Sequence, residues 1–167
     1  MIIPNDKGIP LIEHRGVQFN PSGIKSILFH RGPSLLIDGV VAFNEKSKTL
    51  TAHRYITPDS PEVKGHFPGN PVLPLTKAAE MGFQAAALLS WCLFEDIEGL
   101  PMAKKINPVA HKPILPGVVY IKVKLEKFRK PFFFFSGQVV NERQDEVLAE
   151  LNNIVGVLVT FEQCKPS

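Results

Sequence analysis

The sequence predicts an α+β domain in which one long buried helix is wrapped by a curved antiparallel sheet of five or six strands. The helix is predicted over residues 78–94, a run rich in alanine and leucine that has no proline and no β-branched residue. Segments rich in Val, Ile, Phe and Leu flank this run and are joined mostly by short turns. At 167 residues the chain is long enough to bury a sizeable core within one domain.

The predicted helix is apolar on nearly all of its faces, which is typical of a helix covered by other structure. Its only charged residue is Glu80, and its other polar side chains are Gln84 and Ser90. A membrane span needs about 20 predominantly apolar residues. This run carries Glu80 near its start and ends at Glu95 and Asp96, so we expect a core helix and no membrane segment.

The clearest strand signal is an alternation of apolar and polar residues over 119–126, which predicts a strand with one buried and one solvated face. Further strands are expected over residues 35–43, 49–56, 132–140 and 147–161, with a hairpin turn over 141–145. An antiparallel sheet of this kind has edges that can pair with a second copy of the chain.

The composition excludes several classes of protein. A net charge of +3 is too small to indicate nucleic-acid binding, and the N-terminus has no charged segment followed by an apolar run that would mark a signal peptide. Cys92 and Cys164 lie far apart, and no two histidines have the spacing of metal ligands. We therefore expect a cytoplasmic protein with reduced thiols and with no metal or other cofactor.

A histidine and a glutamate form the candidate catalytic pair. His66 precedes a loop containing Pro68, Pro71 and Pro74, and each proline restricts its own backbone and that of the residue before it. Glu80 follows in the opening turns of the apolar helix. A base on a stiff loop and an acid in an apolar helix are suited to general acid–base chemistry.

Gln84 lies four residues after Glu80, so the two side chains share a helix face and the amide could orient the carboxyl. Unpaired burial would raise the pKa of the carboxyl, which suits a proton donor. Structural interpretations remain for each residue: a turn histidine at 66, a helix-start carboxylate at 80 and a satisfied core amide at 84. His30 is expected to be structural, and residues 132–135 a buried strand or subunit contact rather than a ligand site.

Three ordered motifs resemble the 3-hydroxyacyl-(acyl carrier protein) dehydratases. Residues 65–74 (GHFPGNPVLP) with Glu80 and Gln84 resemble that family's H-F-P-x-x-P-x-x-P-G followed by E-A-x-x-Q. Residues 24–38 resemble its I-x-x-I-L-P-H-R-x-P-F-L-L-V-D, and residues 112–117 resemble its R-P-V-x-P-G-D. The match covers roughly residues 24–160, so we expect one domain over 1–167 with an N-terminal extension over 1–23.

The resemblance implies a hot-dog fold and a homodimer, or three such dimers in a hexamer, with each active site at a dimer interface. The substrate would be a 3-hydroxyacyl chain carried as a thioester on acyl carrier protein. Its dehydration would give the trans-2-enoyl thioester, in fatty-acid synthesis or a related acyl or polyketide pathway. By the same resemblance, His66 would take the α-proton and Glu80 would give a proton to the departing hydroxyl.

The substrate-binding residues that the resemblance implies are the backbone N–H of Leu75, which would polarise the thioester carbonyl, and Gln84 behind Glu80. An acyl tunnel beside the helix would be lined by Phe67, Phe83 and Ala87. Leu75 stands where the family has glycine, and its side chain is expected to crowd the thioester. The chain is therefore interpreted as a divergent member of the family.

Two other functions remain open. A thioesterase of the same fold would also use a carboxylate on the central helix, but the loop histidine favours dehydration. A catalytically silent acyl-binding or scaffold subunit is the second alternative, and Leu75 is the residue that best supports it.

Overall fold

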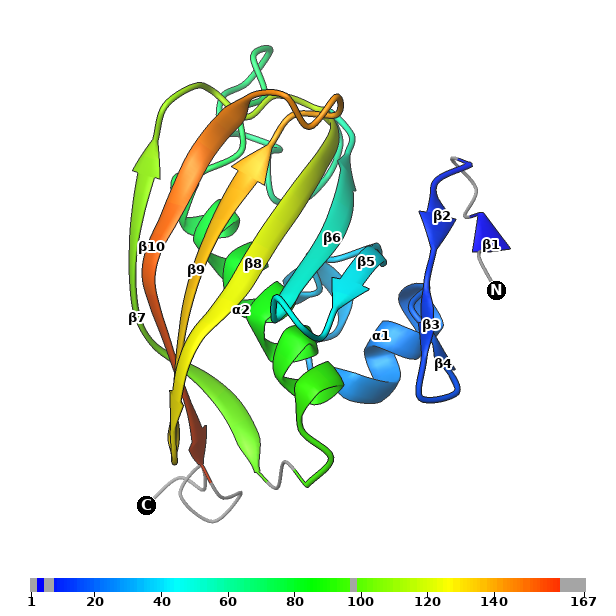
Figure 1. Ribbon diagram of the computed structural model, residues 1–167. Coiled ribbons are helices and arrows are strands. Elements are labelled where there is room, and N and C mark those ends of the chain that lie inside the picture. Colours follow the sequence, from blue (N-terminus) through cyan, green and yellow to red (C-terminus); the bar gives the residue numbers. More distant parts are fainter. Residues whose placement is uncertain (1–2, 5–7, 97–98, 160–167) are drawn as a thin grey trace, which may run out of the picture.

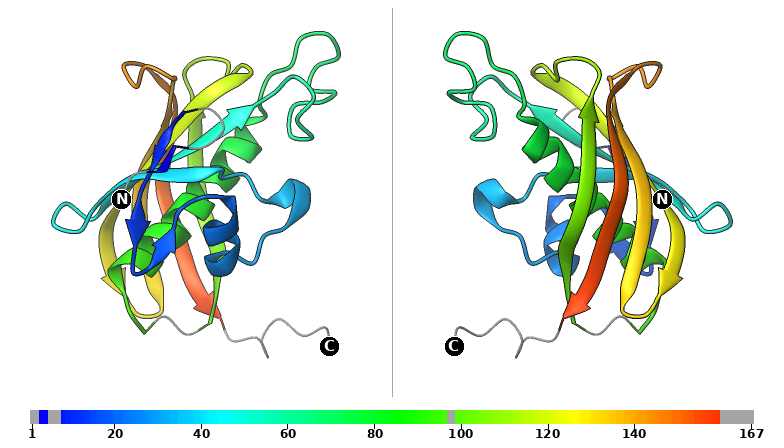
Figure 2. Two further views of the ribbon diagram at one scale, coloured as in Figure 1. Left: turned by 90° about the vertical axis from the view of Figure 1, so that its right-hand side faces the viewer. Right: turned by 90° about the vertical axis from the view of Figure 1, so that its left-hand side faces the viewer.

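The computed structural model describes residues 3–4, 8–96 and 99–159, and its centre is one long helix held in the concave face of a curved sheet (Figures 1 and 2). The helix, α2, spans Leu75–Leu93. The sheet is antiparallel throughout and has the strand order β5-β6-β8-β9-β10-β7. Its strands are β5 (Gly39–Asn44), β6 (Thr49–Ile56), β7 (Leu100–Ala110), β8 (Gly117–Arg129), β9 (Phe132–Val140) and β10 (Val147–Val159). The predicted α+β architecture with a wrapped central helix is confirmed.

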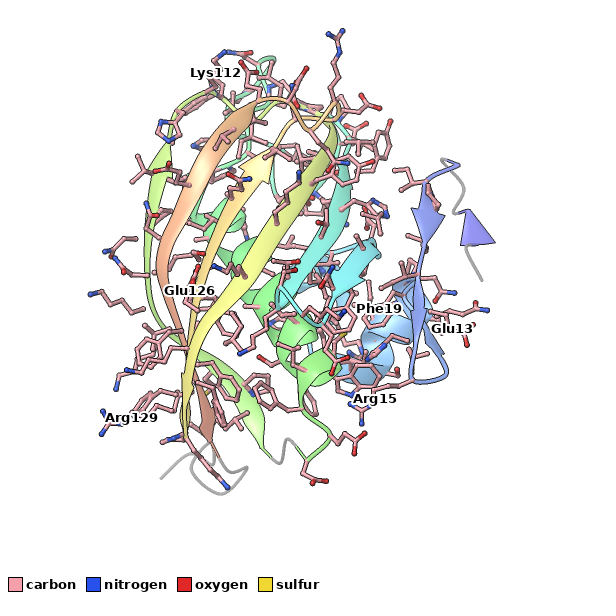
Figure 3. The ribbon with its side chains drawn as sticks, in the orientation of Figure 1. Glu13, Arg15, Phe19, Lys112, Glu126 and Arg129 are labelled. Atoms are coloured by element: carbon pink, nitrogen blue, oxygen red, sulfur yellow. The ribbon has the colours of Figure 1, made fainter. Side chains whose placement is uncertain are left out.

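Short elements precede the sheet. They are the paired strands β1 (Ile3–Pro4) and β2 (Pro10–Leu11), the hairpin of β3 (Glu13–His14) and β4 (Val17–Gln18), helix α1 (Pro21–Ile27) and the 3-10 turn η1 (Gly32–Ser34). Figure 3 shows Arg15 and Phe19 beside the C-terminal end of α2. Arg15 donates a 2.8 Å hydrogen bond to the carbonyl of Trp91, and the ring centroids of Phe19 and Trp91 lie 6.0 Å apart. The N-terminal segment therefore covers the end of the helix.

Helix α2 begins at Leu75, earlier than the predicted residue 78, because Pro74 is its N-cap residue. Its first turn therefore includes the exposed Thr76 and the partly exposed Lys77. Most of its length is buried, as its composition predicted. Gly82 permits a close approach between helix and sheet: a Cβ atom there would lie 2.6 Å from Cδ1 of Leu151 on β10.

The strand predictions are right where the apolar pattern is strong. Strands β6 and β9 have the predicted bounds, and β8 is longer than predicted. Strand β10 is confirmed as far as Val159, and the remaining predicted residues, 160–161, lie outside the described part of the chain. The strand predicted over 35–43 is partly wrong, because the strand begins only at Gly39. The edge strand β7 was missed; it contains Pro101 and Pro108, and prolines in strands are tolerated mainly at sheet edges.

The loop over residues 57–74 projects beyond the sheet and is fastened to β6 by a buried ion-pair cluster (Figure 2). Nη2 of Arg54 lies 2.6 Å from Oε1 of Glu62, whose side chain is only 1% exposed, and Nη1 of Arg54 lies 2.8 Å from Oδ1 of Asp38. Burial lowers the pKa of Arg54, but the two carboxylates outweigh this effect and raise it, so the guanidinium stays charged. The other oxygen of Asp38 accepts the N–H of Tyr55 at 2.7 Å.

We expect Arg54→Met to lower the free energy of unfolding by about 3–5 kcal/mol, because it leaves the carboxylate of Glu62 buried without a cation. Urea denaturation followed by circular dichroism measures this loss. The matched control is Lys112→Met, which breaks an exposed pair with Glu146 (Lys112 is labelled in Figure 3) and should cost about 0–1 kcal/mol. Equal losses in the two variants would show that the Arg54 cluster does not hold the loop.

Candidate active site

A cavity of about 700 Å³ lies between α2, the segment 26–30 and strands β7, β9 and β10. Its wall is mostly apolar. The wall includes apolar side chains of different sizes, such as those of Phe83, Ala87, Phe133 and Phe135. His30 and Glu80 are the only titratable side chains among the described residues of the wall. Chemistry at this cavity therefore centres on one carboxyl and one imidazole.

Glu80 lies in the second turn of α2, and its Oε1 atom receives two polar contacts. Nε2 of Gln84 donates to it at 2.9 Å, and Nε2 of His30 lies 3.1 Å away. Burial raises the pKa of this carboxyl, but the hydrogen bonds from His30 and Gln84 and the nearby charge of Lys77 outweigh burial and bring the pKa below its usual value. The predicted rise of this pKa is wrong, because it assumed an unpaired carboxyl.

Gln84 is completely buried and all its polar atoms are used. Its Oε1 accepts the N–H of Leu36 at 2.8 Å, while its Nε2 donates to the carbonyl of Ser34 at 2.7 Å and to Glu80. Because the backbone N–H of Leu36 needs an acceptor, the orientation of the amide is fixed and its NH₂ group faces the carboxyl. The predicted contact between Gln84 and Glu80 is confirmed, and Gln84 is also a satisfied core amide.

His66 lies in the loop before α2, outside the cavity wall. Its Nδ1 lies 2.9 Å from the carbonyl oxygen of Val72, and the N–H of Val72 donates to the carbonyl of His66 at 2.7 Å. A carbonyl oxygen can only accept, so Nδ1 carries the proton and Nε2 is the proton-accepting nitrogen of the neutral ring. The ring stacks on Phe67 at a centroid distance of 4.2 Å. No contact joins His66 to Glu80 within the part of one chain that the structure describes.

Leu75 is the first residue of α2, and its backbone N–H makes no hydrogen bond to another described residue. Its partly buried side chain packs against the core and does not line the cavity, and the expected crowding of the thioester by Leu75 stays a prediction. Phe83 and Ala87 line the cavity as predicted, whereas Phe67 is 57% exposed and lies outside it. One chain thus gathers Glu80, Gln84 and Phe83, and leaves the loop residues and the helix start apart from them.

Two features of the wall escaped the sequence prediction. His30, expected to be structural, contacts Glu80, and nothing in the sequence separation of these residues indicates their contact. Phe133 and Phe135 line the cavity from alternate positions of β9, where residues two apart face the same side of the sheet. The two-residue spacing of Phe133 and Phe135 within a predicted strand was the sequence signal that places both side chains on one face.

The remaining candidate groups give no second site within the residues that the structure describes. Burial raises the pKa of the Cys92 thiol to about 12, so it is not a reactive thiolate, and Cys164 lies outside the described residues. Over residues 3–4, 8–96 and 99–159, no group of three or more His, Cys, Asp or Glu side chains is placed to hold a metal ion. None of the described helices is long and apolar enough to cross a membrane.

Solved structures with the same fold include enzymes of two kinds. The dehydratase heterocomplex ApeI:P from Xenorhabdus doucetiae superposes with a TM-score of 0.70 at 20% identity, over 84% of this chain and 93% of that chain. A mutant of thioesterase PA1618 from Pseudomonas aeruginosa superposes with a TM-score of 0.58 at 11% identity, over 72% of this chain and 80% of that chain. At these identities the likeness concerns the fold, and the expected hot-dog fold is confirmed.

Sequence comparison identifies the family. The chain is 35% identical over 126 residues to the 3-hydroxyacyl-[acyl-carrier-protein] dehydratase FabZ of Vibrio atlanticus (strain LGP32), covering 71% of this chain and 81% of the relative. It is 31% identical over 138 residues to the FabZ of Syntrophobacter fumaroxidans, covering 80% and 91%. The FabA-like domain matches residues 28–150, which include the His66 loop, the whole of α2 and the cavity-lining residues from Leu28 to Phe135. The chain therefore belongs to the FabA-like family of 3-hydroxyacyl-(acyl carrier protein) dehydratases.

Proposed function

We propose that this protein dehydrates 3-hydroxyacyl thioesters carried on acyl carrier protein to trans-2-enoyl thioesters, in fatty-acid synthesis or a related acyl or polyketide pathway. The observation that carries the proposal is Glu80, a carboxyl oriented by Gln84 in a mostly apolar cavity wall. The relatives named above supply the substrate class. The cytoplasmic location expected from the sequence is part of the same proposal.

The reaction needs a base and an acid. Nε2 of His66 takes the proton from the carbon next to the thioester carbonyl, and the electron pair of that C–H bond forms the new double bond. The bond between the next carbon and its hydroxyl oxygen breaks, and the oxygen takes a proton from the Glu80 carboxyl and leaves as water. The unused N–H of Leu75, at the positive end of α2, stabilises the charge that develops on the carbonyl oxygen.

We propose that a second copy of the chain completes each site. His66 and Glu80 make no contact within one described chain. Strand β7 is 11 residues long and pairs only with β10 among the described strands, so its other side is an open edge. Phe67 and Leu115 are more than half exposed and belong to the apolar surface that a partner would cover. In such a homodimer, His66 of one subunit and Glu80 of the other act on the same substrate.

Hydrolysis is the competing reaction, because thioesterases share this fold. The fold alone does not separate the two functions. The loop histidine, with Nδ1 fixed and Nε2 ready to accept a proton, favours proton abstraction from carbon. Measuring enoyl formation and thioester cleavage on one carrier-bound substrate distinguishes them, and the absence of both would indicate a silent acyl-binding or scaffold subunit.

We expect His66→Ala and Glu80→Ala each to lower kcat for enoyl formation by about 10²–10⁴-fold, because each removes one proton-transfer group. The absorbance of the enoyl thioester measures the rate, and circular dichroism checks that the variants fold. Glu126→Ala removes an exposed carboxylate on β8, outside the cavity (Figure 3), and should leave kcat unchanged. Near wild-type activity in either of the first two variants would contradict their assigned roles.

Mixing the two inactive variants tests the shared site. A heterodimer of His66→Ala and Glu80→Ala chains contains one intact site, so complete subunit exchange should restore roughly a quarter of wild-type activity. The same exchange procedure applied to each variant alone is the control. A monomer in analytical ultracentrifugation, or no recovery after exchange confirmed by mass spectrometry, would rule out the shared site.

Chain length should control affinity through the cavity. Each additional buried methylene is worth about 0.8 kcal/mol, or roughly fourfold in Kd, until the cavity is full. Ala87→Leu should shorten the longest chain that gains affinity, since Ala87 lines the cavity, whereas Ala42→Leu on the exposed face of β5 should not. Titration with 3-hydroxyacyl chains of increasing length measures the limit. Affinity that does not depend on length would mean that only the carrier and the thioester are recognised.

A further inference from the structure

The polar contact between His30 and Glu80 has no role in the reaction described so far. Nε2 of His30 lies 3.1 Å from Oε1 of Glu80, and both side chains are about one-third exposed at the cavity. The other ring nitrogen, Nδ1, is buried and has no hydrogen-bond partner among the described residues. The Glu80 carboxyl is therefore the one polar group bound by the ring in the described chain.

The charged surroundings of this pair are simple. Gln84 donates to the same oxygen of Glu80, and Lys77 contributes a positive charge from the preceding turn of α2. The Arg31 guanidinium is directed at backbone carbonyls, including that of His30. The described residues that β7, β9 and β10 contribute to the wall are glycine, proline or apolar side chains. No other acid or base in the described wall shares a proton with the pair.

We propose that His30 is the immediate source of the proton that Glu80 delivers to the departing hydroxyl. The inference rests on the proposed dehydration and adds a residue to it. The carboxylate takes a proton from Nε2 of the imidazolium ring and gives a proton to the hydroxyl oxygen as the C–O bond breaks. The ring becomes neutral imidazole, the carboxylate is unchanged, and solvent returns the proton to the ring after the product leaves. His30 thus acts on the substrate only through Glu80.

The geometry explains why the carboxyl needs such a partner. Two nitrogen donors on one oxygen stabilise the ionised carboxylate, so Glu80 by itself holds a proton poorly near neutral pH. The lowered pKa of Glu80 agrees with this effect. An imidazolium ion in general holds its proton to a higher pH than a carboxylic acid does, so an adjacent imidazole is the better proton store.

The pH dependence of kcat for His30→Gln tests the proposal, since glutamine can keep a hydrogen bond to Glu80 but cannot store a proton. Its alkaline limb should move to lower pH than in the wild type. Model imidazole and carboxyl pKa values differ by about two units, so kcat at pH 8 should fall on the order of 100-fold, and the loss should shrink as pH is lowered. The matched control is His111→Gln, which removes the histidine of an exposed pair with Glu150 outside the cavity and should leave the profile unchanged.

Other profiles would overturn the inference. A profile parallel to that of the wild type, or an equal loss at every pH, would mean that His30 only supports the shape of the site. Higher activity at every pH would mean that His30 obstructs Glu80. If the wild type forms no enoyl product at any pH, the proposed function itself fails, which is a separate result.

Titration by nuclear magnetic resonance needs no enzymatic activity, and its first measurement uses only the wild-type protein. In the wild-type protein, the ¹⁵N signals of the His30 ring and the ¹³C signal of the Glu80 carboxyl should change at the same two midpoints, as coupled groups do. In folded His30→Gln, the Glu80 carboxyl should protonate at a higher pH than in the wild type, because a neighbouring positive charge is gone. Independent midpoints in the wild type would overturn the proposal.

Discussion

Burying one amide side chain in an apolar helix constrains much of this structure. Gln84 has no access to water, so its oxygen and its NH₂ group must find partners within the protein. It finds them on the segment that precedes β5, at the N–H of Leu36 and the carbonyl of Ser34, and on Glu80 one turn earlier. These three contacts fix the rotation of α2 about its own axis relative to that segment. The Glu80 carboxyl takes its position in the cavity wall from them.

The same contacts explain where the sequence was misleading. Residues 35–37 are as apolar as a strand, and the structure buries them. The N–H of Leu36 and the carbonyl of the preceding Ser34, however, bind the Gln84 side chain instead of a neighbouring strand. The pKa of Glu80 shows the same dependence on distant partners. Local spacing predicted the donor at Gln84, whereas His30 comes from a segment far away in the sequence and, together with Gln84 and Lys77, lowers the pKa that burial alone would raise.

What could be predicted was local. The helix, β6 and β9 follow from composition and alternation, and the contact between residues 80 and 84 follows from helical spacing. Strand β7 has prolines and an exposed outer side, so no apolar pattern marks it. The prolines after His66 predicted a stiff loop, but the anchoring of that loop by Arg54 and Glu62 depends on how β6 faces the loop. Contacts between distant segments were the part that sequence patterns left open.

Gly82 and the alanines that follow it on α2 have a consequence for how such an enzyme can diversify. At Gly82 the helix lies so close to Leu151 that a methyl group would require that side chain to move, whereas about one turn further on the small residues at 86 and 87 border the cavity. Side-chain size on one helix thus contributes to the shape of the cavity, at positions distinct from Glu80 and Gln84. If the proposed function holds, single codon changes at those positions would alter the accepted chain length without touching Glu80 or Gln84, so duplicated copies could diverge in substrate while keeping the same polar groups.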